Sequence, residues 1–253
     1  MSTEPRKTIL ITGASSGLGA EMARQFADRG HDLALCARRT DRLEELKAEL
    51  EARHPGQRFE VAALDVNDDD AVFEVFRKFK ADFGTIDRVI VNAGLGKGAP
   101  LGTGRYDANK QTAVTNFIGA LAQSEAAMEI FREQNAGHLV MISSMSAMRG
   151  MPKAATTYGA SKAGVAHLAE GLRAELHGSP IKVTVIYPGY IRSEMNEKVK
   201  KAPFLVSTQK GVRGIVDAIE KEKAHANVPA WPWVPMGFAM RYLPLPVVRK
   251  LLG

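Results

Sequence analysis

Short apolar runs alternate along the chain with longer amphipathic stretches. Runs of this length and composition are typical of strands buried on both faces of a parallel sheet. The predicted strands are 8–12, 33–36, 59–64, 88–91, 138–142 and 182–187. The predicted helices are one that opens in the stretch 13–19 and runs to about 29, then 41–53, one from 68 onward, 107–134, 158–177 and 210–222. This alternation predicts an α/β fold whose ligands bind at the carboxyl ends of the strands.

The glycine-rich stretch after the first strand predicts a phosphate-binding turn. It runs from Gly13 to Gly19 and opens the first helix. Glycines let the backbone approach a pyrophosphate, and a helix N-terminus offers free N–H groups to it. A purely structural tight turn is the alternative. The cofactor candidates here are Gly13, Ser15, Ser16, Gly17, Leu18 and Gly19.

The end of the second strand predicts which dinucleotide binds. NAD binding calls for an acidic residue that holds the ribose 2′-hydroxyl, and the chain has Arg38 and Arg39 instead. Guanidinium groups suit a 2′-phosphate, so NADP(H) is the predicted cofactor. Solvated charges at a helix cap are the alternative. Further cofactor candidates follow the later strands and are Asp65, Val66, Asn92, Ala93, Gly94, Pro188, Gly189, Ile191 and Ser193.

Tyr158 and Lys162 predict acid–base chemistry. They lie four residues apart in a stretch without helix breakers, so both side chains project from one helical face. A neighbouring ammonium favours the phenolate, which suits Tyr158 to exchange a proton with a substrate oxygen near neutral pH. A serine after the fifth strand, Ser144 or Ser146, is positioned to hold the same oxygen. Asn116 is polar among apolar helical neighbours, which predicts a buried hydrogen-bonding role.

Composition narrows the class of protein. The chain has 253 residues, 45% hydrophobic and 25% charged, which predicts one globular domain, 1–253, with 228–253 as an atypical apolar tail. The single cysteine, Cys36, lies in an apolar run and predicts a core thiol in a reducing compartment. The stretch 1–7 is short and polar, so we expect neither a signal peptide nor a transmembrane span, and a cytoplasmic location.

The charge pattern excludes some partners and a metal. The net charge is +6, but basic residues are scattered among acids without a basic arm or zinc-finger spacing, so no nucleic-acid partner is expected. An anionic small molecule or a membrane surface fits this charge better. The adjacent acids 68–70 are interpreted as first-turn carboxylates that complement a helix dipole, and no metal site is predicted.

Taken together and in order, these motifs resemble the short-chain dehydrogenase/reductase family in its single-domain form, over about 7–193. The resemblance implies a doubly wound, Rossmann-like parallel sheet of seven strands with helices on both faces. It implies hydride transfer between nicotinamide and a carbonyl or alcohol, with Lys162 lowering the pKa of Tyr158 and both residues also contacting the cofactor. It further implies a homodimer or homotetramer. The tetrad that it implies is Asn116, Ser144, Tyr158 and Lys162.

Two details depart from the family pattern. Ser144 lies one residue farther from Tyr158 than the usual spacing, and Ser146 lies one residue nearer. We favour Ser144 because it closes the fifth strand and the loop 150–155 can absorb the extra residue. The tail 228–253 also lacks the small-residue ending that many members use in tetramer contacts.

The tail leaves two interpretations open. Its prolines prevent one long helix, and Arg241 and the prolines interrupt any span long enough to cross a bilayer. It either packs over the active-site mouth or a neighbouring subunit, or lies on a membrane surface. Both interpretations predict a hydrophobic substrate.

Two rival functions differ in class. One is a non-catalytic NADP(H)-sensing or scaffold protein on the same fold, and the intact tetrad argues against it. The other is an epimerase or dehydratase of nucleotide sugars, which normally needs an added substrate domain that this chain has no length to hold.

Overall fold

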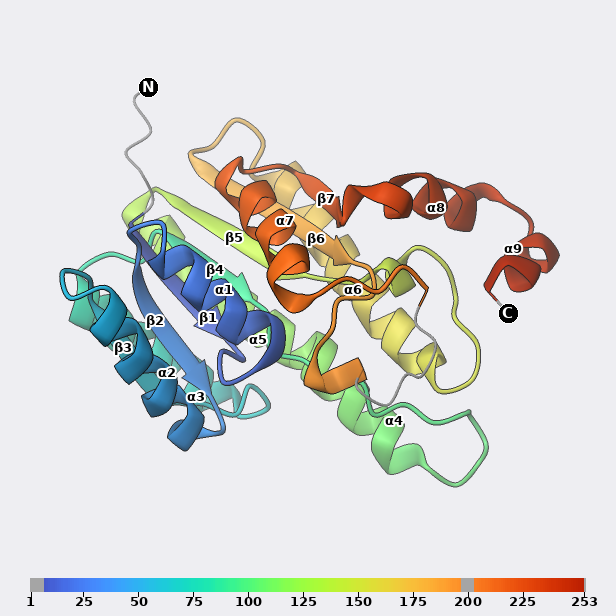
Figure 1. The fold of residues 1–253 in the computed structure, drawn as a ribbon, viewed down its shortest axis with the longest axis horizontal. Helices are drawn as coiled ribbons and strands as arrows, with labels where there is room; N and C mark the ends of the chain where they lie inside the picture. The colour runs from blue at the N-terminus through green and yellow to red at the C-terminus, as the bar shows by residue number, and fades with distance from the viewer. Residues whose placement is uncertain (1–6, 197–202, 253) are drawn as a thin grey trace.

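In the computed structural model, which describes residues 7–196 and 203–252, seven parallel strands form one sheet (Figure 1). The strand order is β3-β2-β1-β4-β5-β6-β7. The strands are β1 (Thr8–Thr12), β2 (Asp32–Ala37), β3 (Phe59–Ala63), β4 (Arg88–Val91), β5 (Gly137–Ile142), β6 (Ile181–Pro188) and β7 (His225–Val228). The six strands predicted from the apolar runs are confirmed. The seventh, β7, is short and half-exposed, so the apolar pattern did not reveal it.

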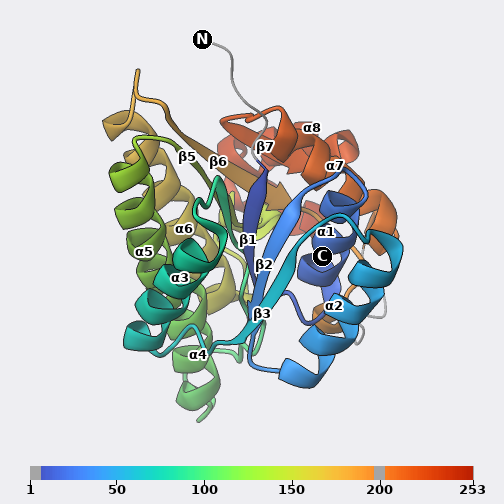
Figure 2. The same ribbon diagram turned by 90° about the vertical axis from the view of Figure 1, so that its left-hand side faces the viewer.

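Helices cover both faces of this sheet (Figure 2). One layer contains α1 (Gly17–Ala27), α2 (Thr40–Arg53) and α7 (Thr208–Glu220). The other layer contains α3 (Asp69–Phe83), α4 (Tyr106–Ala113), α5 (Gly119–Gln134) and α6 (Ala155–Glu175). The predicted doubly wound, Rossmann-like architecture is therefore confirmed.

Side chains alternate between the two layers along each strand, which explains why the strands are apolar throughout. All of β1 is buried: Ile9 and Ile11 pack toward α1 and α7, and Leu10 packs toward α3 and α5. Cys36 is buried in the second of these clusters, as expected of a core thiol, and burial raises the pKa of its thiol.

The order of the strands fixes where a ligand can bind. β1 pairs with β2 on one side and with β4 on the other, so the chain reverses its direction of winding at β1. Successive loops then leave the sheet in opposite directions and open a crevice at the carboxyl ends of β1 and β4. The glycine-rich turn follows β1, and Asn92 follows β4, at this edge.

The helix predicted over 107–134 is observed as α4 and α5 joined by a π-helical segment, Val114–Ile118. The backbone stays helical but makes one wider turn, a feature that propensity does not reveal and that is frequent at functional sites. Asn116 lies in this turn and is fully buried. A Cβ added to Gly119 would lie 2.7 Å from the carbonyl oxygen of Val66, so the glycine allows the helix to approach the end of β3.

The tail forms two helices, α8 (Ala230–Tyr242) and α9 (Leu245–Leu252), at one end of the molecule beyond β7 (Figure 1). The expectation that its prolines prevent one long helix is confirmed. In the ranges 7–196 and 203–252, no helix has the length and apolar composition to span a bilayer. Residues 1–6, on which the expected absence of a signal peptide largely depends, lie outside the described part of the chain.

Candidate functional site

A cavity of about 630 Å³ lies at the carboxyl edge of the sheet. Every cofactor candidate predicted from the sequence lines it, as does Ser144. The lining residues that sequence reasoning missed are Ala37, Leu64, Leu95, Gly96, Lys97, Thr115, Ile142, Ser143, Glu194 and Met195. Most of them adjoin a predicted residue at the end of a strand, so extending each predicted cluster by one or two positions would have found them.

The glycine-rich turn brings the ends of β1 and β4 into contact. Gly13 has φ +65°, which favours glycine, and a Cβ there would lie 2.9 Å from the Cα of Ala93. A Cβ on Gly19 would lie 2.3 Å from the carbonyl oxygen of Gly13. The amide nitrogen of Asn92 donates to the Thr12 carbonyl oxygen at 2.9 Å and holds the turn against β4. Backbone therefore forms the cavity floor, where a pyrophosphate can come close.

The helix after this turn leaves its first N–H groups available. Ser16 is the N-cap residue of α1, and its side chain makes no capping hydrogen bond to the helix. The first turn of α1 contains no acidic residue, so no side-chain carboxylate there neutralises the positive end of the helix dipole. This N-terminus has the features of an anion-binding site and faces the cavity.

Arginines gather at the end of β2. The Arg39 guanidinium donates to the hydroxyl oxygens of Ser15 and Ser16 at 3.3 and 2.6 Å. Arg39 and Arg42 both pair with the carboxylate of Glu194. Arg42 was not predicted, although it lies three residues after Arg39 and so on the same side of the first turn of α2.

Arg38 has a different environment from Arg39. Its side chain is 61% exposed, and its guanidinium lies 3.9 Å from the Asp65 carboxylate at the end of β3. Such exposed pairs contribute little to stability. The Arg38 side chain is therefore free to reorient toward a ligand that enters beside Asp65.

Tyr158 and Ser144 lie next to each other in the lining of the cavity. Ser144 follows β5 and hydrogen-bonds the Tyr158 side chain. Burial raises the pKa of Tyr158, and the Ser144 hydrogen bond offsets part of that rise. The Ser144 hydroxyl also accepts the Ser146 N–H at 3.1 Å and caps the 3-10 turn Met145–Ala147. Ser146 lies beside Ser144 in that turn, and of the two serines only Ser144 lines the cavity.

Lys162 lies one helical turn after Tyr158, on the same face of α6, as predicted. Its ammonium donates to the Ile142 carbonyl oxygen at 2.8 Å, and the residue is 5% exposed. Burial lowers the pKa of Lys162 to about 8. The expectation that the lysine lowers the tyrosine pKa is not met in this structure, because burial raises the pKa of Tyr158. A neutral phenol is the form that can donate a proton.

Asn116 does not line the cavity but hydrogen-bonds the backbone of Leu95, which does. Its amide oxygen accepts the Leu95 N–H and its amide nitrogen donates to the Leu95 carbonyl, each at 2.8 Å. The nitrogen also donates to Ser161 at 3.3 Å. A Cβ on Gly94 would lie 3.0 Å from the Asn116 oxygen and 3.4 Å from the Lys162 ammonium. The predicted buried role is therefore observed, and its effect is to hold the segment after β4 close to Lys162.

The tail borders the same edge of the sheet. Trp233 is 3% exposed, and a Cβ on Gly189 would lie 2.1 Å from its indole nitrogen, so the ring lies directly on the turn after β6. Its ring centroid lies 5.9 Å from that of Tyr190, a residue close enough to Tyr158 that its phenolate form would add to the effect of the burial that raises the pKa of Tyr158. The Met145 side chain contacts α8 near Gly237. One face of the tail therefore packs on protein beside Tyr158.

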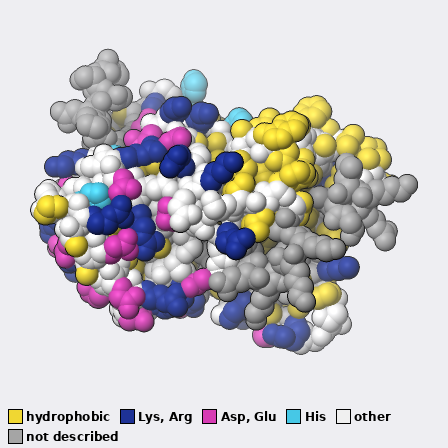
Figure 3. Space-filling model, viewed as in Figure 1, with side chains coloured by type: hydrophobic (Ala, Val, Ile, Leu, Met, Phe, Trp, Pro, Cys, Tyr) yellow, Lys and Arg dark blue, Asp and Glu magenta, His cyan; other side chains and the backbone are white. Residues whose placement is uncertain are grey.

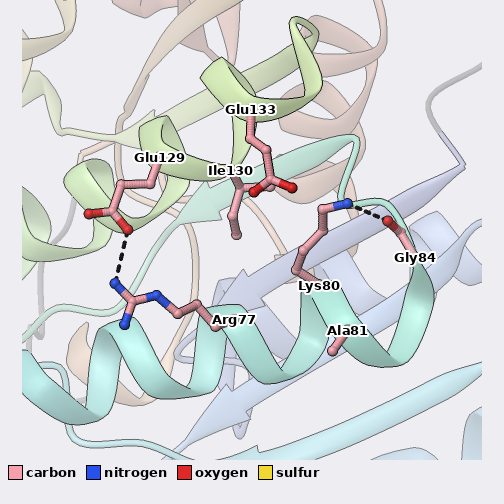
Figure 4. Close-up of a pocket in the computed structure, with 7 residues that line it drawn as sticks. All are labelled: Arg77, Lys80, Ala81, Gly84, Glu129, Ile130 and Glu133. Atoms are coloured by element: carbon pink, nitrogen blue, oxygen red, sulfur yellow. Dashed lines mark hydrogen bonds and ion pairs between the residues drawn. The ribbon is translucent and has the colours of Figure 1, made fainter.

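A second hollow, of about 440 Å³, lies between α3 and α5 (Figure 4). Arg77 pairs with Glu129 across it at 3.2 Å, and the Lys80 ammonium bonds the Gly84 carbonyl. Arg77 and Glu129 are already paired there, and the hollow lies between two helices away from the strand ends, so we assign it no function. In the part of the chain that the structure describes, no group of three His, Cys, Asp or Glu side chains is placed to hold a metal ion. Asp68, one of the predicted first-turn acids, caps α3.

Comparison with known proteins identifies the family. The family model for short chain dehydrogenase matches residues 7–203. An uncharacterized oxidoreductase of Mycobacterium tuberculosis is 54% identical over 245 residues, which cover 97% of each chain. The chain therefore belongs to the short-chain dehydrogenase family and is an oxidoreductase of that family.

Two further similarities bear on substrate and cofactor. The 11-beta-hydroxysteroid dehydrogenase 1A of Arabidopsis thaliana is 32% identical over 245 residues, which cover 89% of this chain and 69% of that one. A short-chain dehydrogenase from Sphingobium yanoikuyae, solved in complex with NADPH, is 27% identical, with a TM-score of 0.82 over 97% of this chain and 94% of that chain. Another chain of this fold was solved with NAD. The family therefore implies a nicotinamide cofactor without choosing between the two.

Proposed function

We propose that this protein is an NADP(H)-dependent oxidoreductase that transfers a hydride between nicotinamide and a hydrophobic carbonyl or alcohol substrate. The proposal rests above all on the hydrogen bond between Tyr158 and Ser144 beside the buried Lys162, in a cavity lined by the predicted dinucleotide residues. The chain works as a single nucleotide-binding domain whose tail adjoins the substrate side.

The residues that line the cavity fit a dinucleotide. The Gly13 to Gly19 turn and the α1 N-terminus would hold the pyrophosphate. Asp65 and Val66 would border the adenine. Asn92 to Gly94 and Pro188 to Ser193 would line the nicotinamide half, and Lys162 and Tyr158 would contact its ribose. The bound cofactor supplies the hydride, and the protein supplies orientation and proton transfer.

The reduction requires a proton for each hydride. Ser144 holds the substrate carbonyl oxygen by a hydrogen bond and so polarises the carbon that accepts the hydride. Tyr158 donates its hydroxyl proton to the oxygen as the C–O double bond becomes single, which leaves an alcohol and a tyrosinate. The Lys162 ammonium, when charged, stabilises that tyrosinate. Asn116 keeps the wall formed by Gly94 and Leu95 in place.

Preference for NADP(H) follows from the residues that come directly after β2. The chain has Arg38 and Arg39 there, where NAD binding calls for an acidic residue, and Arg42 follows in the first turn of α2. Guanidinium groups bind phosphate through paired, charge-assisted hydrogen bonds, which a ribose hydroxyl cannot match. The NADPH complex of the Sphingobium yanoikuyae relative supports the same preference.

A hydrophobic substrate is favoured by the side chains beside Tyr158. Trp233 packs on Tyr190 and on the turn after β6, and Met145, the residue after Ser144, contacts α8 near Gly237. Met195 lines the cavity itself. The name of the Arabidopsis thaliana relative, a hydroxysteroid dehydrogenase, agrees with this chemistry. The non-catalytic alternative is not favoured, because the four predicted catalytic residues are present and lie at one site.

The outer face of the tail supports a second part of the proposal. Its exposed apolar side chains form a continuous patch over α8 and α9 (Figure 3). We call them the tail patch: Trp231, Val234, Phe238, Tyr242, Leu245 and Val247. From Lys223 to Gly253 the sequence has no Asp or Glu, while Arg241 beside the patch is exposed. Apolar and basic side chains together suit an anionic membrane surface, which we propose as the partner of this face.

Subunit association belongs to the same proposal. A homodimer or homotetramer formed through the helices that carry Asn116 and Tyr158 stays a prediction, as does a cytoplasmic location.

The replacement Tyr158→Phe tests the catalytic assignment. It removes the transferable proton and little volume, so turnover of a carbonyl substrate should fall by ~10²-fold or more, while the NADPH dissociation constant stays within about threefold. Ser144→Ala should also lower turnover strongly, and Ser146→Ala is the matched control. Retention of more than about a tenth of the activity in Tyr158→Phe would remove Tyr158 from this role, and a larger loss in Ser146→Ala than in Ser144→Ala would reverse the serine assignment.

A further inference from the structure

Glu194 occupies the arginine cluster at the end of β2. Its carboxylate pairs with Arg39 at 3.1 Å, with Arg42 through the other oxygen, and with the Ser16 hydroxyl. Glu194 comes from the segment after β6, so its side chain reaches across the cavity mouth from the nicotinamide side to the β2 side. The hydrogen bond from Arg42 lowers the pKa of Glu194 to about 2, with smaller contributions from Ser16 and Arg39. The carboxylate is therefore ionised at any working pH.

The donors around this carboxylate are those that bind a phosphate monoester. Two guanidinium groups and a serine hydroxyl converge on one anion, and Arg39 is itself held by Ser15 and Ser16 of the glycine-rich turn. The end of the second strand of this fold is where the adenosine ribose of a dinucleotide lies. The carboxylate of Glu194 therefore stands where the 2′-phosphate of NADP(H) would make its charged contacts.

We propose that Glu194 is an internal competitor of the cofactor 2′-phosphate for Arg39 and Arg42, and thereby sets how strongly the protein prefers NADP(H) over NAD(H). The inference rests on the proposed NADP(H) function. A 2′-phosphate must displace the carboxylate to reach both arginines, which weakens NADPH binding. NADH has no such phosphate, so it leaves the Glu194 contacts in place, and the carboxylate offsets the positive charge beside its ribose.

The same competition links the two halves of the cavity. Ser193 and Met195, the neighbours of Glu194, line the cavity on the nicotinamide side. When the 2′-phosphate binds Arg39 and Arg42, the ion pairs of Glu194 with these arginines break. Ser193 and Met195 are then no longer connected to α2 through Glu194. Equilibrium linkage requires the converse as well: whatever holds Glu194 on the arginines lowers the affinity for the phosphate by the same factor.

The test is the replacement Glu194→Gln, which keeps the size of the side chain and removes its charge. The two ion pairs are about half exposed, so their loss should tighten NADPH binding by about threefold to thirtyfold. NADH binding should stay within about twofold. Glu44→Gln is the matched control, because Glu44 is an exposed carboxylate on α2, the helix that carries Arg42, and both variants lose one negative charge. Glu44→Gln should change neither affinity by more than about twofold.

Two adenosine monophosphates test the contact of the 2′-phosphate with Arg39 and Arg42 separately from the contacts of the rest of the cofactor. Binding of adenosine 2′-monophosphate should tighten in Glu194→Gln by the same factor as binding of NADPH, and binding of adenosine 5′-monophosphate should not change. In an Arg42→Ala background, Glu194→Gln should have a clearly smaller effect, because one of the two contested guanidinium groups is gone.

The outcomes separate this inference from the proposed cofactor preference. Weaker NADPH binding in Glu194→Gln would mean that the carboxylate positions the arginines for the phosphate, and would overturn the inference. An equal change for NADPH and NADH would overturn it too. If the wild-type protein binds NADPH no tighter than NADH while Glu194→Gln tightens adenosine 2′-monophosphate, the inference stands and the wild-type preference for NADP(H) is refuted. If neither the wild-type protein nor Glu194→Gln binds adenosine 2′-monophosphate, the inference and the proposed preference for NADP(H) are both refuted.

Discussion

Trp231 and Trp233 are the two tryptophans of the chain and lie two residues apart in α8. The side chain of Trp233 is buried, whereas that of Trp231 is exposed. Trp233 is 3% exposed and packs on Gly189, Tyr190 and Phe204, with ring centroids 5.9 and 6.2 Å from those of the last two. Trp231 is 79% exposed. The pair therefore measures how much the tail contributes to stability through its inner face.

We expect Trp233→Ala to destabilise the protein by about 3–5 kcal/mol, the usual cost of removing a buried tryptophan side chain together with the cavity that it leaves. For a chain of this size each kcal/mol lowers the melting temperature by about 2–4 °C, so the melting temperature should fall by about 6–20 °C. Trp231→Ala should change the stability by no more than about 0.5 kcal/mol, because little of the ring is buried.

Thermal unfolding followed by circular dichroism measures both values, and fluorescence checks the structural premise. Each variant retains a single tryptophan. Trp231→Ala should emit at shorter wavelength, from the buried Trp233, and Trp233→Ala at longer wavelength, from the exposed Trp231. Equal melting temperatures for the two variants would refute the claim that α8 is anchored through Trp233. Emission maxima in the opposite order would refute the burial on which the claim depends.

Two further predictions concern the catalytic lysine and the tail patch. In the reductive direction, kcat/KM for NADPH should fall as the pH rises through about 8, because the pKa of Lys162 is lowered to about 8 and its cation, present below that pH, stabilises the tyrosinate; a profile that is flat up to about pH 9.5 would contradict this. In a Trp233→Phe variant, the emission of Trp231 should shift to shorter wavelength with vesicles that contain phosphatidylglycerol and not with phosphatidylcholine alone. The same shift with protein concentration and no vesicles would indicate a second copy of the chain on the tail patch.

The sequence determined the elements and most of the cavity because both are local in origin. Apolar runs mark strands that are buried on both faces, and glycines and small residues at their ends mark the places where backbone must come close to a ligand. Apart from Tyr158 and Lys162, which lie on α6, each cofactor candidate from Gly13 to Ser193 lies at the end of a strand, in the segment just after it or in the helical turn that follows. Parallel strands carry those ends to one edge, so their convergence could be foreseen without coordinates.

The tertiary structure decided the features that depend on contacts between distant segments. The ion pair of Glu194 with Arg39 and Arg42 joins residues about 150 positions apart, and the strand and helix patterns carry no signal for it. The π turn around Asn116 ends beside Gly119, which lies close to the Val66 carbonyl of a distant segment. Sequence periodicity reports which side of an element faces the core, whereas pairing across the fold depends on how the elements are packed.

The tail shows the same division within one segment. Its prolines ruled out one long helix from the sequence alone, as observed. Which tryptophan would be buried was not readable, because α8 has apolar residues all round and no polar face to orient it. In the folded protein Gly189, just after β6, has no side chain and leaves space that the Trp233 ring fills, while Trp231 stays exposed.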